Sequence, residues 1–483
     1  MKKYDHLLYK RGFLLTDWEN VEFDNTITNE IVSRWKKIKI GKYQVLIEKS
    51  LSNAKHTVGN CSVLIFGLVL NPYKMENNIV NISISLTNKL NQNKDLFLDE
   101  LDELSGRFTI IARDIEGNTE IYNDTCGTRT VYYDTQSEHT IISSHSYLIS
   151  DLMNYKTSEV AKDVLADNTF KGRKYLPGLL SPFNEIKPLT PNTSYNIEKR
   201  EVNRFFPRED NKKFTLEEAA DNLTNILRNQ SKLLNEHNDT VASITAGLDS
   251  RLTLAVQNEQ NTNTKYFVHY CSDNIDGFLE DMIIAEKITR YLGEDFSQFG
   301  YSNKDIPTDL SEYRYVWQRN IGMYRGSLKQ FKMYTDNLYK NRIHIRSNVA
   351  EIGRVFYKDR GKEPTSEHLS TLFTKSEYGK TEFVINQFND FIETTSFYES
   401  RFYNYNYADL FYWEHRMAMW HSWLVLESDT AFETFVPFNN RKFLQTMLAI
   451  PEKYRENDDL MIAILKNVNP DLLKFPVNKK YLN

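Results

Sequence analysis

Cysteine is scarce in this sequence, and long apolar runs are missing. The three cysteines are Cys61, Cys126 and Cys271, and they form no C-x-x-C pair. Their number and spacing argue against a disulfide framework or a zinc site and favour a reducing compartment. No run of about 18 apolar residues could span a membrane, and the opening segment MKKYDHLLYKRGF has no apolar core of a signal peptide. We therefore expect a cytoplasmic protein without a membrane partner.

The sequence also lacks an excess of basic charge. Its net charge is −5, with 26% charged and 40% hydrophobic residues. This balance excludes a disordered chain and gives no indication of a nucleic-acid partner. The 483 residues exceed the length of one ordinary core, so we expect two domains.

Two stretches of different character follow one another along the chain. Residues 1–205 contain short β-branched and aromatic runs such as LSGRFTIIARD and TRTVYYD, separated by turn residues, which is typical of a sheet of hairpins. The charged segment RFFPREDNKKF is then predicted to be a linker. After it, a capping box at Thr215 and Glu218 predicts a helix. Strands such as TVASIT and KYFVHYCS alternate with helical patterns in residues 206–483, which predicts a parallel α/β sheet.

The segment SITAGLDSRL joins one of these strands to the next helix. Ligands of open α/β sheets bind at the carboxyl ends of strands, and the free N–H groups of residues 246–250 would favour an anion. Gly247 permits close backbone approach and unusual dihedral angles, and Ser250 supplies a hydroxyl. Asp249 repels a phosphate unless a divalent cation lies between them. The segment therefore predicts a pyrophosphate and Mg²⁺ site; the alternative is a plain connection in which Asp249 caps the helix.

This segment resembles the pyrophosphate loop of the asparagine synthetase family, Ser-Gly-Gly-Leu-Asp-Ser, with Thr245 and Ala246 in its first two places. Three stretches similar to that family follow in its order: KYFVHYCSDNIDGFLEDMIIAEKITRYLG, IHIRSNVAEIGRVFY and ETFVPFNNRKFLQTMLAIP. Upstream, residues 104–134 resemble the family's glutaminase domain. The resemblance implies an α/β fold class. Residues 1–205 would form an Ntn-type αββα sandwich, and residues 206–483 a doubly wound pyrophosphatase-loop domain with a helical end.

The resemblance also implies a set of site residues around two cofactors, ATP and Mg²⁺. The implied nucleotide-binding residues are Ile244, Thr245, Ala246, Gly247, Leu248, Asp249, Ser250, Arg251, His269 and Tyr270. Asp249 and Glu351 would share the Mg²⁺. The candidate catalytic residues are Glu351, Arg354, Asn348, Arg346 and Lys466.

The first departure from the family concerns the source of nitrogen. The family's glutaminase uses a cysteine directly after the initiator methionine as its nucleophile, whereas Lys2 follows Met1 here. We therefore expect residues 1–205 to be a glutaminase in shape only. Ammonia or a substrate amine would then act as the nucleophile, which is similar to the β-lactam synthetases and lasso-peptide cyclases.

Other departures fall in the second half. Asn348 stands where the family often has Glu, and an amide cannot act as a general base. Arg346 and Arg354 could grip a carboxylate or the α-phosphate; the alternative is that they form ordinary surface ion pairs. In the run MIAILKN, Lys466 takes the family's arginine place and Ile462 its lysine place, so a catalytic lysine is either absent or supplied elsewhere, for example by Lys479 or Lys480.

These residues predict ATP- and Mg²⁺-dependent amide-bond formation through an acyl-adenylate, with release of AMP and pyrophosphate. The partners would be small-molecule or peptide carboxylate and amine substrates, with a possible homodimer or partner enzymes of the same pathway. Two alternatives stay open: a catalytically weak nucleotide-binding scaffold, and an ammonia-dependent asparagine synthetase. The run YWEHRMAMWHSW, with Tyr412, Arg416 and Trp420 at helical spacing, is predicted to be a core or interface stripe.

Overall fold

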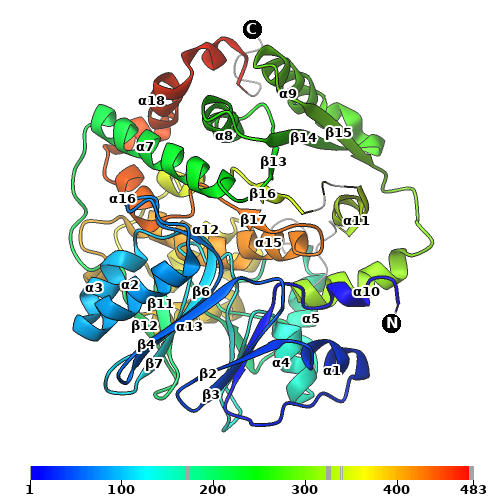
Figure 1. Ribbon diagram of the computed structural model, residues 1–483, viewed down its shortest axis with the longest axis vertical. Coiled ribbons are helices and arrows are strands. Elements are labelled where there is room, and N and C mark those ends of the chain that lie inside the picture. Colours follow the sequence, from blue (N-terminus) through cyan, green and yellow to red (C-terminus); the bar gives the residue numbers. More distant parts are fainter. Residues whose placement is uncertain (1, 169–174, 323–327, 338, 340, 478–483) are drawn as a thin grey trace.

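The computed structural model describes residues 2–168, 175–322, 328–337, 339 and 341–477. In this part of the chain the strands form two six-stranded sheets and one five-stranded sheet (Figure 1). The strands of the six-stranded sheets lie within residues 13–204, and those of the five-stranded sheet lie within residues 240–435. The mixed α/β class expected from the sequence is confirmed, whereas a domain boundary at residues 205 and 206 stays a prediction.

The two six-stranded sheets pack face to face and are antiparallel throughout. The first has the order β10-β8-β9-β1-β3-β2 and the second β12-β11-β7-β6-β5-β4. The strands of the first are β1 (Phe13–Thr16), β2 (Lys36–Ile40), β3 (Tyr43–Ile47), β8 (Tyr132–Asp134), β9 (Ile141–Ser143) and β10 (Ile186–Pro188). Those of the second are β4 (Asn53–Val58), β5 (Cys61–Leu70), β6 (Ser105–Arg113), β7 (Thr119–Asn123), β11 (Thr193–Asn196) and β12 (Glu201–Arg204).

The two sheets and the helices on their outer faces form four layers, because side chains alternate between the two faces of each strand. Phe13 and Leu15 belong to the core between the sheets, whereas Leu14 faces outward into a second cluster, as the two-residue period of a strand requires. Helices cover the outer faces: α4 (Ser146–Met153) lies on the first sheet, and α2 (Ile79–Gln92) lies on the second. Further helices here are α1 (Thr26–Val32), α3 (Lys94–Leu101) and α5 (Glu159–Ala166).

The five-stranded sheet is parallel, as the sequence predicts. Its order is β15-β14-β13-β16-β17, and its strands are β13 (Thr240–Ser243), β14 (Thr264–Cys271), β15 (Phe296–Tyr301), β16 (Ile343–Ile345) and β17 (Thr434–Phe435). The chain runs outward from β13 to β15 through α8 (Leu248–Glu259) and α9 (Leu279–Tyr291). It returns through α10 (Leu310–Ile321) and α11 (Leu328–Asn337) to β16, on the other side of β13. The direction of strand addition therefore reverses between β13 and β16.

Helices complete the second half of the molecule. The predicted capping box is confirmed: the Thr215 side chain accepts from the Glu218 amide at the start of α7 (Leu216–Asn235), and Glu218 accepts from the Thr215 amide. The remaining helices are α12 (Ser366–Phe373), α13 (Glu382–Thr395), α14 (Tyr407–Phe411), a π-helix (Tyr412–His421), α15 (Ser422–Ser428), α16 (Arg441–Leu448), α17 (Glu452–Glu456) and α18 (Asp459–Val468). Within the described residues, no helix is long and apolar enough to cross a membrane.

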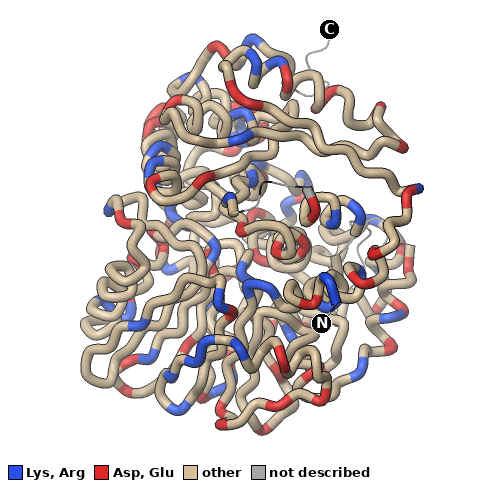
Figure 2. The backbone as a smooth tube through the Cα atoms, turned by 45° about the vertical axis from the view of Figure 1, so that its right-hand side comes forward, with Lys and Arg blue, Asp and Glu red and all other residues tan. Residues whose placement is uncertain are grey.

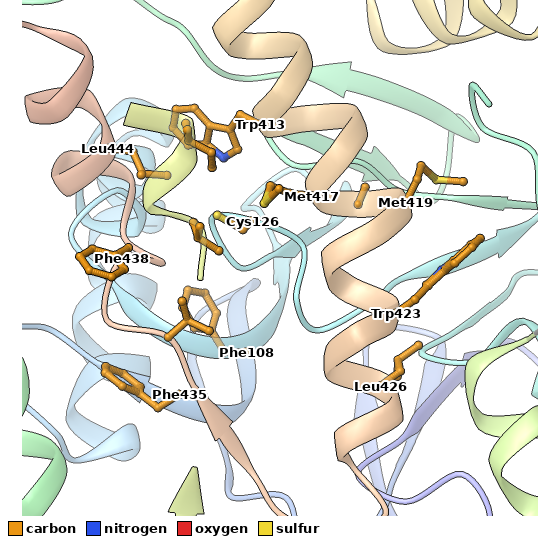
Figure 3. Close-up of a cluster of buried hydrophobic side chains, with 14 of the residues drawn as sticks. Phe108, Cys126, Trp413, Met417, Met419, Trp423, Leu426, Phe435, Phe438 and Leu444 are labelled. Atoms are coloured by element: carbon orange, nitrogen blue, oxygen red, sulfur yellow. The ribbon is translucent and has the colours of Figure 1, made fainter. Parts of the chain in front are cut away.

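The two halves share one hydrophobic core. Phe108 and Cys126 of the first half pack with Trp413, Met417 and Phe438 of the second (Figure 3). The predicted linker takes part in this packing, because its first two aromatic side chains are buried. Burial of these two phenylalanine rings stabilises the start of the segment against the core, and its role as a linker stays a prediction. The three cysteines are free and buried, as expected without a disulfide framework.

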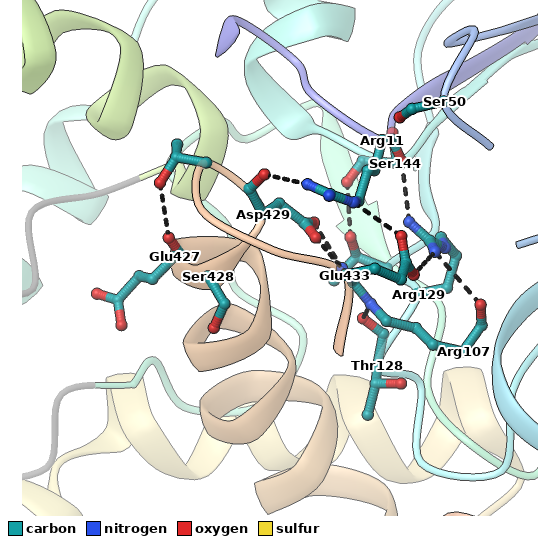
Figure 4. A network of polar contacts seen from close by, with 12 residues as sticks. Arg11, Ser50, Arg107, Thr128, Arg129, Ser144, Glu427, Ser428, Asp429 and Glu433 are labelled. Atoms are coloured by element: carbon teal, nitrogen blue, oxygen red, sulfur yellow. Dashed lines mark hydrogen bonds and ion pairs between the residues drawn. The ribbon is translucent and has the colours of Figure 1, made fainter. Parts of the chain in front are cut away.

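A polar network lies beside this core (Figure 4). Arg107 of β6 pairs with the Asp429 carboxylate just beyond α15, and both side chains are almost fully buried. Arg129 and Arg11 pair with Glu433 at 2.7 and 2.8 Å. Burial opposes ionisation of Glu433, yet the arginines hold the pKa of this carboxyl below its usual value. Elsewhere, acidic and basic residues alternate along both halves (Figure 2), in keeping with the small net charge.

Candidate functional site

Two predicted phosphate segments leave the sheet side by side. β13 and β16 are parallel neighbours, with Ala242 opposite Ile345. The segment SITAGLDSRL follows β13 and enters α8, and the segment from Arg346 to Gly353 follows β16. Strand order reverses between these two strands, and such a switch point leaves a crevice at their carboxyl ends. The structure therefore brings together two segments that lie about a hundred residues apart in the sequence.

The backbone of the first segment differs from the expectation at Gly247. This residue is the N-cap of α8 with φ −74° and ψ 159°, an extended conformation open to most residues. The predicted unusual dihedral angles are therefore not used. The alternative that Asp249 caps the helix is wrong as well, because α8 has no side-chain cap and Asp249 lies inside its first turn.

Several polar groups of the first segment are satisfied within the chain. The Thr245 amide donates to Ser250 Oγ at 3.1 Å, and the Gly247 amide donates to Thr245 Oγ1 at 3.2 Å. The Ala246 amide donates to the carboxylate of Asp281 on α9 at 2.7 Å. Ala246 is thus not the outward-facing donor that the sequence predicts. The amides of the first turn, from Leu248 to Ser250, remain the donors that α8 can offer to an anion.

Asp249 lies at the centre of the site and faces Arg354. Arg354 Nη2 and Nη1 donate to the two carboxylate oxygens of Asp249 at 2.6 and 3.1 Å. The Nε of the same guanidinium lies 2.7 Å from Asp458, the residue before α18. Arg354 therefore forms a double ion pair, and the expectation of an ordinary surface pair is wrong, since both Arg354 and Asp249 are largely buried.

Glu351 adds negative charge next to this pair. Burial raises the pKa of Asp249 above its usual value, and the charge of Glu351 acts in the same direction, while Arg354 opposes both. A charge acts on a neighbouring carboxyl in this way over a short distance, so Glu351 belongs to the surroundings of Asp249. That Asp249 and Glu351 share a Mg²⁺ stays a prediction.

Arg346 and Asn348 contact each other at the end of β16. Arg346 Nε donates to Asn348 Oδ1 at 3.2 Å, and its Nη1 donates to Ser428 Oγ at 3.2 Å. Ser347, between them, donates to Thr253 Oγ1 of α8 at 2.7 Å. These bonds tie the end of β16 to α8 and to α15, so both phosphate segments rest on one framework.

His269 and Tyr270 end β14 beside the first segment. His269 Nδ1 lies 2.8 Å from Tyr334 Oη, and its Nε2 lies 3.2 Å from Gln330 Nε2. Burial and the charge of Arg346 lower the pKa of His269 to about 4, so the ring is neutral near pH 7. The ring of Tyr270 packs closely against the backbone of Gly300 on β15. Tyr334 of α11 is a site neighbour that the sequence reasoning missed.

Two predicted site residues are placed elsewhere. The Arg251 guanidinium is fully buried and donates to the carbonyl oxygens of Ala246, Leu472, Phe475 and Pro476. It anchors the C-terminal segment to the loop and does not face a phosphate, so that assignment of its side chain is corrected. Lys466 is exposed near the far end of α18. Eight residues of helix place it roughly 12 Å along the axis from Asp458.

The tertiary structure adds two carboxylates to the site, Asp281 and Asp458, whose contacts the sequence does not predict. The bond from the Ala246 amide to Asp281 joins two segments and could not be read from the sequence. Asp458 carried no signal at all, because its partner Arg354 lies on another segment. Lys479 and Lys480, offered as substitute lysines, lie outside the described residues.

The carboxylates near Arg354 are the type of ligand that Mg²⁺ prefers, but two of them do not fill the coordination of the ion. Carboxylate oxygens are hard ligands, and Mg²⁺ is commonly held by one or two carboxylates together with substrate phosphates and water. Asp249 and Glu351 meet that description. No cluster of three or more His, Cys, Asp or Glu that could hold a metal occurs within residues described by the structure. Phosphate oxygens would have to complete the coordination, and Arg354 would have to leave Asp249.

Comparison with protein-family models and with curated proteins finds no match. Among solved structures, NMN synthetase from Francisella tularensis is similar at 14% identity and a TM-score of 0.22, covering 42% of this chain and 96% of its own. Glutamine PRPP amidotransferase from B. subtilis is similar at 12% identity and a TM-score of 0.24, and the match covers 61% of this chain and 60% of its own. NH3-dependent NAD synthetase from Campylobacter jejuni is similar at 11% identity and a TM-score of 0.21, and the match covers 38% of this chain and 96% of its own.

At these TM-scores the similarities define no family for this chain. The observed fold and site define an α/β protein with a two-sheet sandwich and a parallel sheet, in which Arg354 pairs with Asp249 beyond the carboxyl ends of β13 and β16.

Proposed function

We propose that this protein is an ATP- and Mg²⁺-dependent ligase that joins a carboxylate to an amine and releases AMP and pyrophosphate. We also propose an Ntn-type sandwich and a pyrophosphatase-loop domain of the asparagine synthetase kind. One observation carries the proposal: the two segments with phosphate-site patterns leave adjacent strands at the switch point, where the charge of Glu351 on one segment acts on Asp249 of the other.

The first turn of α8 would bind the phosphates. Its unpaired amides and the helix dipole favour negative charge. Asp249 and Glu351 would hold the Mg²⁺, which when bound screens the charge of the phosphates. Arg354 would exchange its bonds to Asp249 for bonds to a phosphate or to the substrate carboxylate, because a guanidinium binds both groups in the same bidentate manner.

The reaction would proceed in two displacements. A carboxylate oxygen of the substrate attacks the α-phosphorus of ATP, and the bond from that phosphorus to the bridging oxygen breaks, so pyrophosphate leaves. The amine nitrogen then attacks the acyl carbon, loses a proton and displaces AMP. Arg346 beside Asn348 supplies a further positive charge at the end of β16, where it would stabilise the charge that develops on the phosphates.

The nitrogen would come from ammonia or a substrate amine. Cys61 and Cys126 of the first half are fully buried, and burial raises the pKa of both thiols. A thiol of raised pKa is a poor nucleophile because the thiolate is the reactive form. These observations support a sandwich that does not hydrolyse glutamine.

The test is formation of AMP and pyrophosphate from Mg²⁺–ATP in the presence of carboxylates and amines. We expect Asp249→Asn and Glu351→Gln each to lower turnover by about 100-fold or more, the scale seen when electrostatic stabilisation of a transition state is lost. Asp276→Asn, a change at an exposed residue of a neighbouring turn, is the matched control. Unchanged turnover in both site variants would remove the proposal.

A nucleotide-binding scaffold is the second candidate. It is favoured by the closed state of the site, in which Arg354 occupies both oxygens of Asp249 and Asp281 occupies the Ala246 amide. Lys466, the sequence-based candidate for a catalytic cation, also lies away from the crevice. ATP binding without AMP formation under every substrate mixture would favour this candidate.

A further inference from the structure

The π-helix Tyr412–His421 carries an arginine enclosed by aromatic rings. The guanidinium carbon of Arg416 lies 4.9 to 5.5 Å from the centroids of four rings, which are Tyr175, Phe356, Tyr412 and Trp420. The predicted core or interface stripe therefore has a cation at its centre. π-helical turns are rare and occur frequently at functional sites.

Within the described part of the chain, Arg416 forms no ion pair with a carboxylate. Among the residues described by the structure, Arg416 Nη1 donates to Tyr175 Oη at 3.2 Å, and the Tyr412 phenol is a second polar neighbour. Burial lowers the pKa of Arg416, and the neighbouring tyrosines raise it above its usual value. Its Nε is buried without a partner. The neighbouring carboxylate of Glu414 is fully buried and pairs with Arg204 at 2.6 Å. A half-buried guanidinium in this state has donors left for an anion.

The ring cluster adjoins the candidate site. Phe356 follows Arg354 by two residues, and its ring centroid lies 4.5 Å from that of Tyr412. The charge of Glu351 contributes to the raised pKa of Tyr412, whose main cause is burial, so this carboxylate lies near the ring. Arg416 is thus next to the segment that we propose holds Mg²⁺ and the phosphates.

We infer that Arg416 anchors the carboxylate of the substrate, and that this substrate carries an aromatic or large apolar group. The inference rests on the proposed function. A guanidinium grips a carboxylate bidentately, and the exposed ring of Phe356 offers an apolar wall to the rest of the molecule. A substrate such as aspartate would bring a second carboxylate against aromatic walls that offer one cation, and this charge would be left uncompensated.

The test compares binding of phenylacetate and L-aspartate by calorimetry, with Mg²⁺ and a non-hydrolysable ATP analogue present. We expect phenylacetate to bind the wild-type protein at least about tenfold more tightly than L-aspartate, and Arg416→Gln to weaken phenylacetate about tenfold or more. Arg416→Lys, which keeps the charge, should lose less. Affinity for the ATP analogue should not change in Arg416→Gln.

Lys358→Gln is the matched control, because Lys358 is an exposed cation two residues beyond Phe356. It should bind phenylacetate as the wild type does. Thermal unfolding of each variant separates loss of the contact to the carboxylate from loss of the fold. If Arg416→Gln unfolds, Arg416→Lys serves instead, because it keeps a cation among the aromatic rings. The inference is overturned if phenylacetate does not bind, binds equally to Arg416→Gln, or binds more weakly than L-aspartate. Failure of AMP formation with Arg416-dependent phenylacetate binding intact would instead overturn the proposed function.

Discussion

Arg107 and Asp429 lie 322 residues apart in the chain and form a bidentate ion pair, in which Nη2 is 2.7 Å from Oδ2. The two side chains are 2% and 1% exposed, so neither charge is solvated by water. Removing one partner leaves the other buried and uncompensated. We expect Asp429→Asn to lower the free energy of unfolding by about 3–5 kcal/mol, as measured by chemical denaturation.

Two comparisons make this prediction specific to burial. Lys162→Gln, which breaks the exposed pair of Lys162 with Glu159, should change stability little, because exposed pairs contribute little. The double variant Arg107→Met/Asp429→Leu should recover much of the loss, because apolar groups of similar size need no counter-charge. A double variant as unstable as Asp429→Asn would contradict this explanation.

A second prediction concerns the anchor made by Arg251. Its guanidinium donates to carbonyl oxygens of the loop and of the C-terminal segment, and it is fully buried. Arg251→Gln should cost about 3 kcal/mol, because several buried acceptors lose a charged donor. Hydrogen exchange should show faster exchange of residues 472–477 and of the loop. Arg290→Gln, at an exposed position on α9, should neither lower the free energy of unfolding nor speed hydrogen exchange in these residues.

The pair of Arg354 with Asp249 leads to a third prediction. Because Arg354 holds both carboxylate oxygens, it competes with a cation for Asp249. In Arg354→Gln the Mg²⁺ concentration at half-saturation should fall by about tenfold, since 1.4 kcal/mol of competing interaction corresponds to that factor. Lys358→Gln, a nearby exposed cation, should leave it unchanged. Weaker Mg²⁺ binding in Arg354→Gln would show that the arginine assists the metal site instead.

Four buried histidines predict how stability depends on pH. Burial lowers the pKa of His145 and His415 to about 3 and that of His269 to about 4, and it lowers the pKa of His344 as well. An unfolded histidine takes up a proton near pH 6.5. Between about pH 6.5 and 4 the unfolded chain binds more protons, so the free energy of unfolding falls as pH falls, by up to about 1.4 kcal/mol per pH unit for each histidine.

His415→Phe isolates one of these contributions. The His415 ring is stacked on Phe411 and surrounded by further phenylalanine rings, so a phenylalanine suits the site. The variant should lose about 1.4 kcal/mol per pH unit of the slope between pH 6 and 5. His237→Gln, at an exposed position, should keep the wild-type slope. An unaltered slope in His415→Phe would refute the assignment.

The sequence was most informative where a pattern is local. The capping box at Thr215 and Glu218 is formed within four residues, so its prediction was confirmed. Alternation of strands and helices after residue 206 likewise predicted the parallel sheet, because each crossover depends on its own helix and strand. Predictions from the sequence failed where segments far apart in the chain compete for the same charged side chain. Arg251 was assigned to phosphate, but three of the carbonyl oxygens that hold it, those of Leu472, Phe475 and Pro476, lie more than 220 residues away.

What the sequence by itself determined is therefore the class of the fold and the two segments that enter the crevice. Periodicity and turn chemistry are properties of short stretches, and they do not depend on the rest of the chain. Only the tertiary structure decided that Arg354 faces Asp249, that Asp281 binds the loop, and that aromatic rings enclose Arg416. A long charged side chain can reach several partners, and desolvation within the folded protein selects among them.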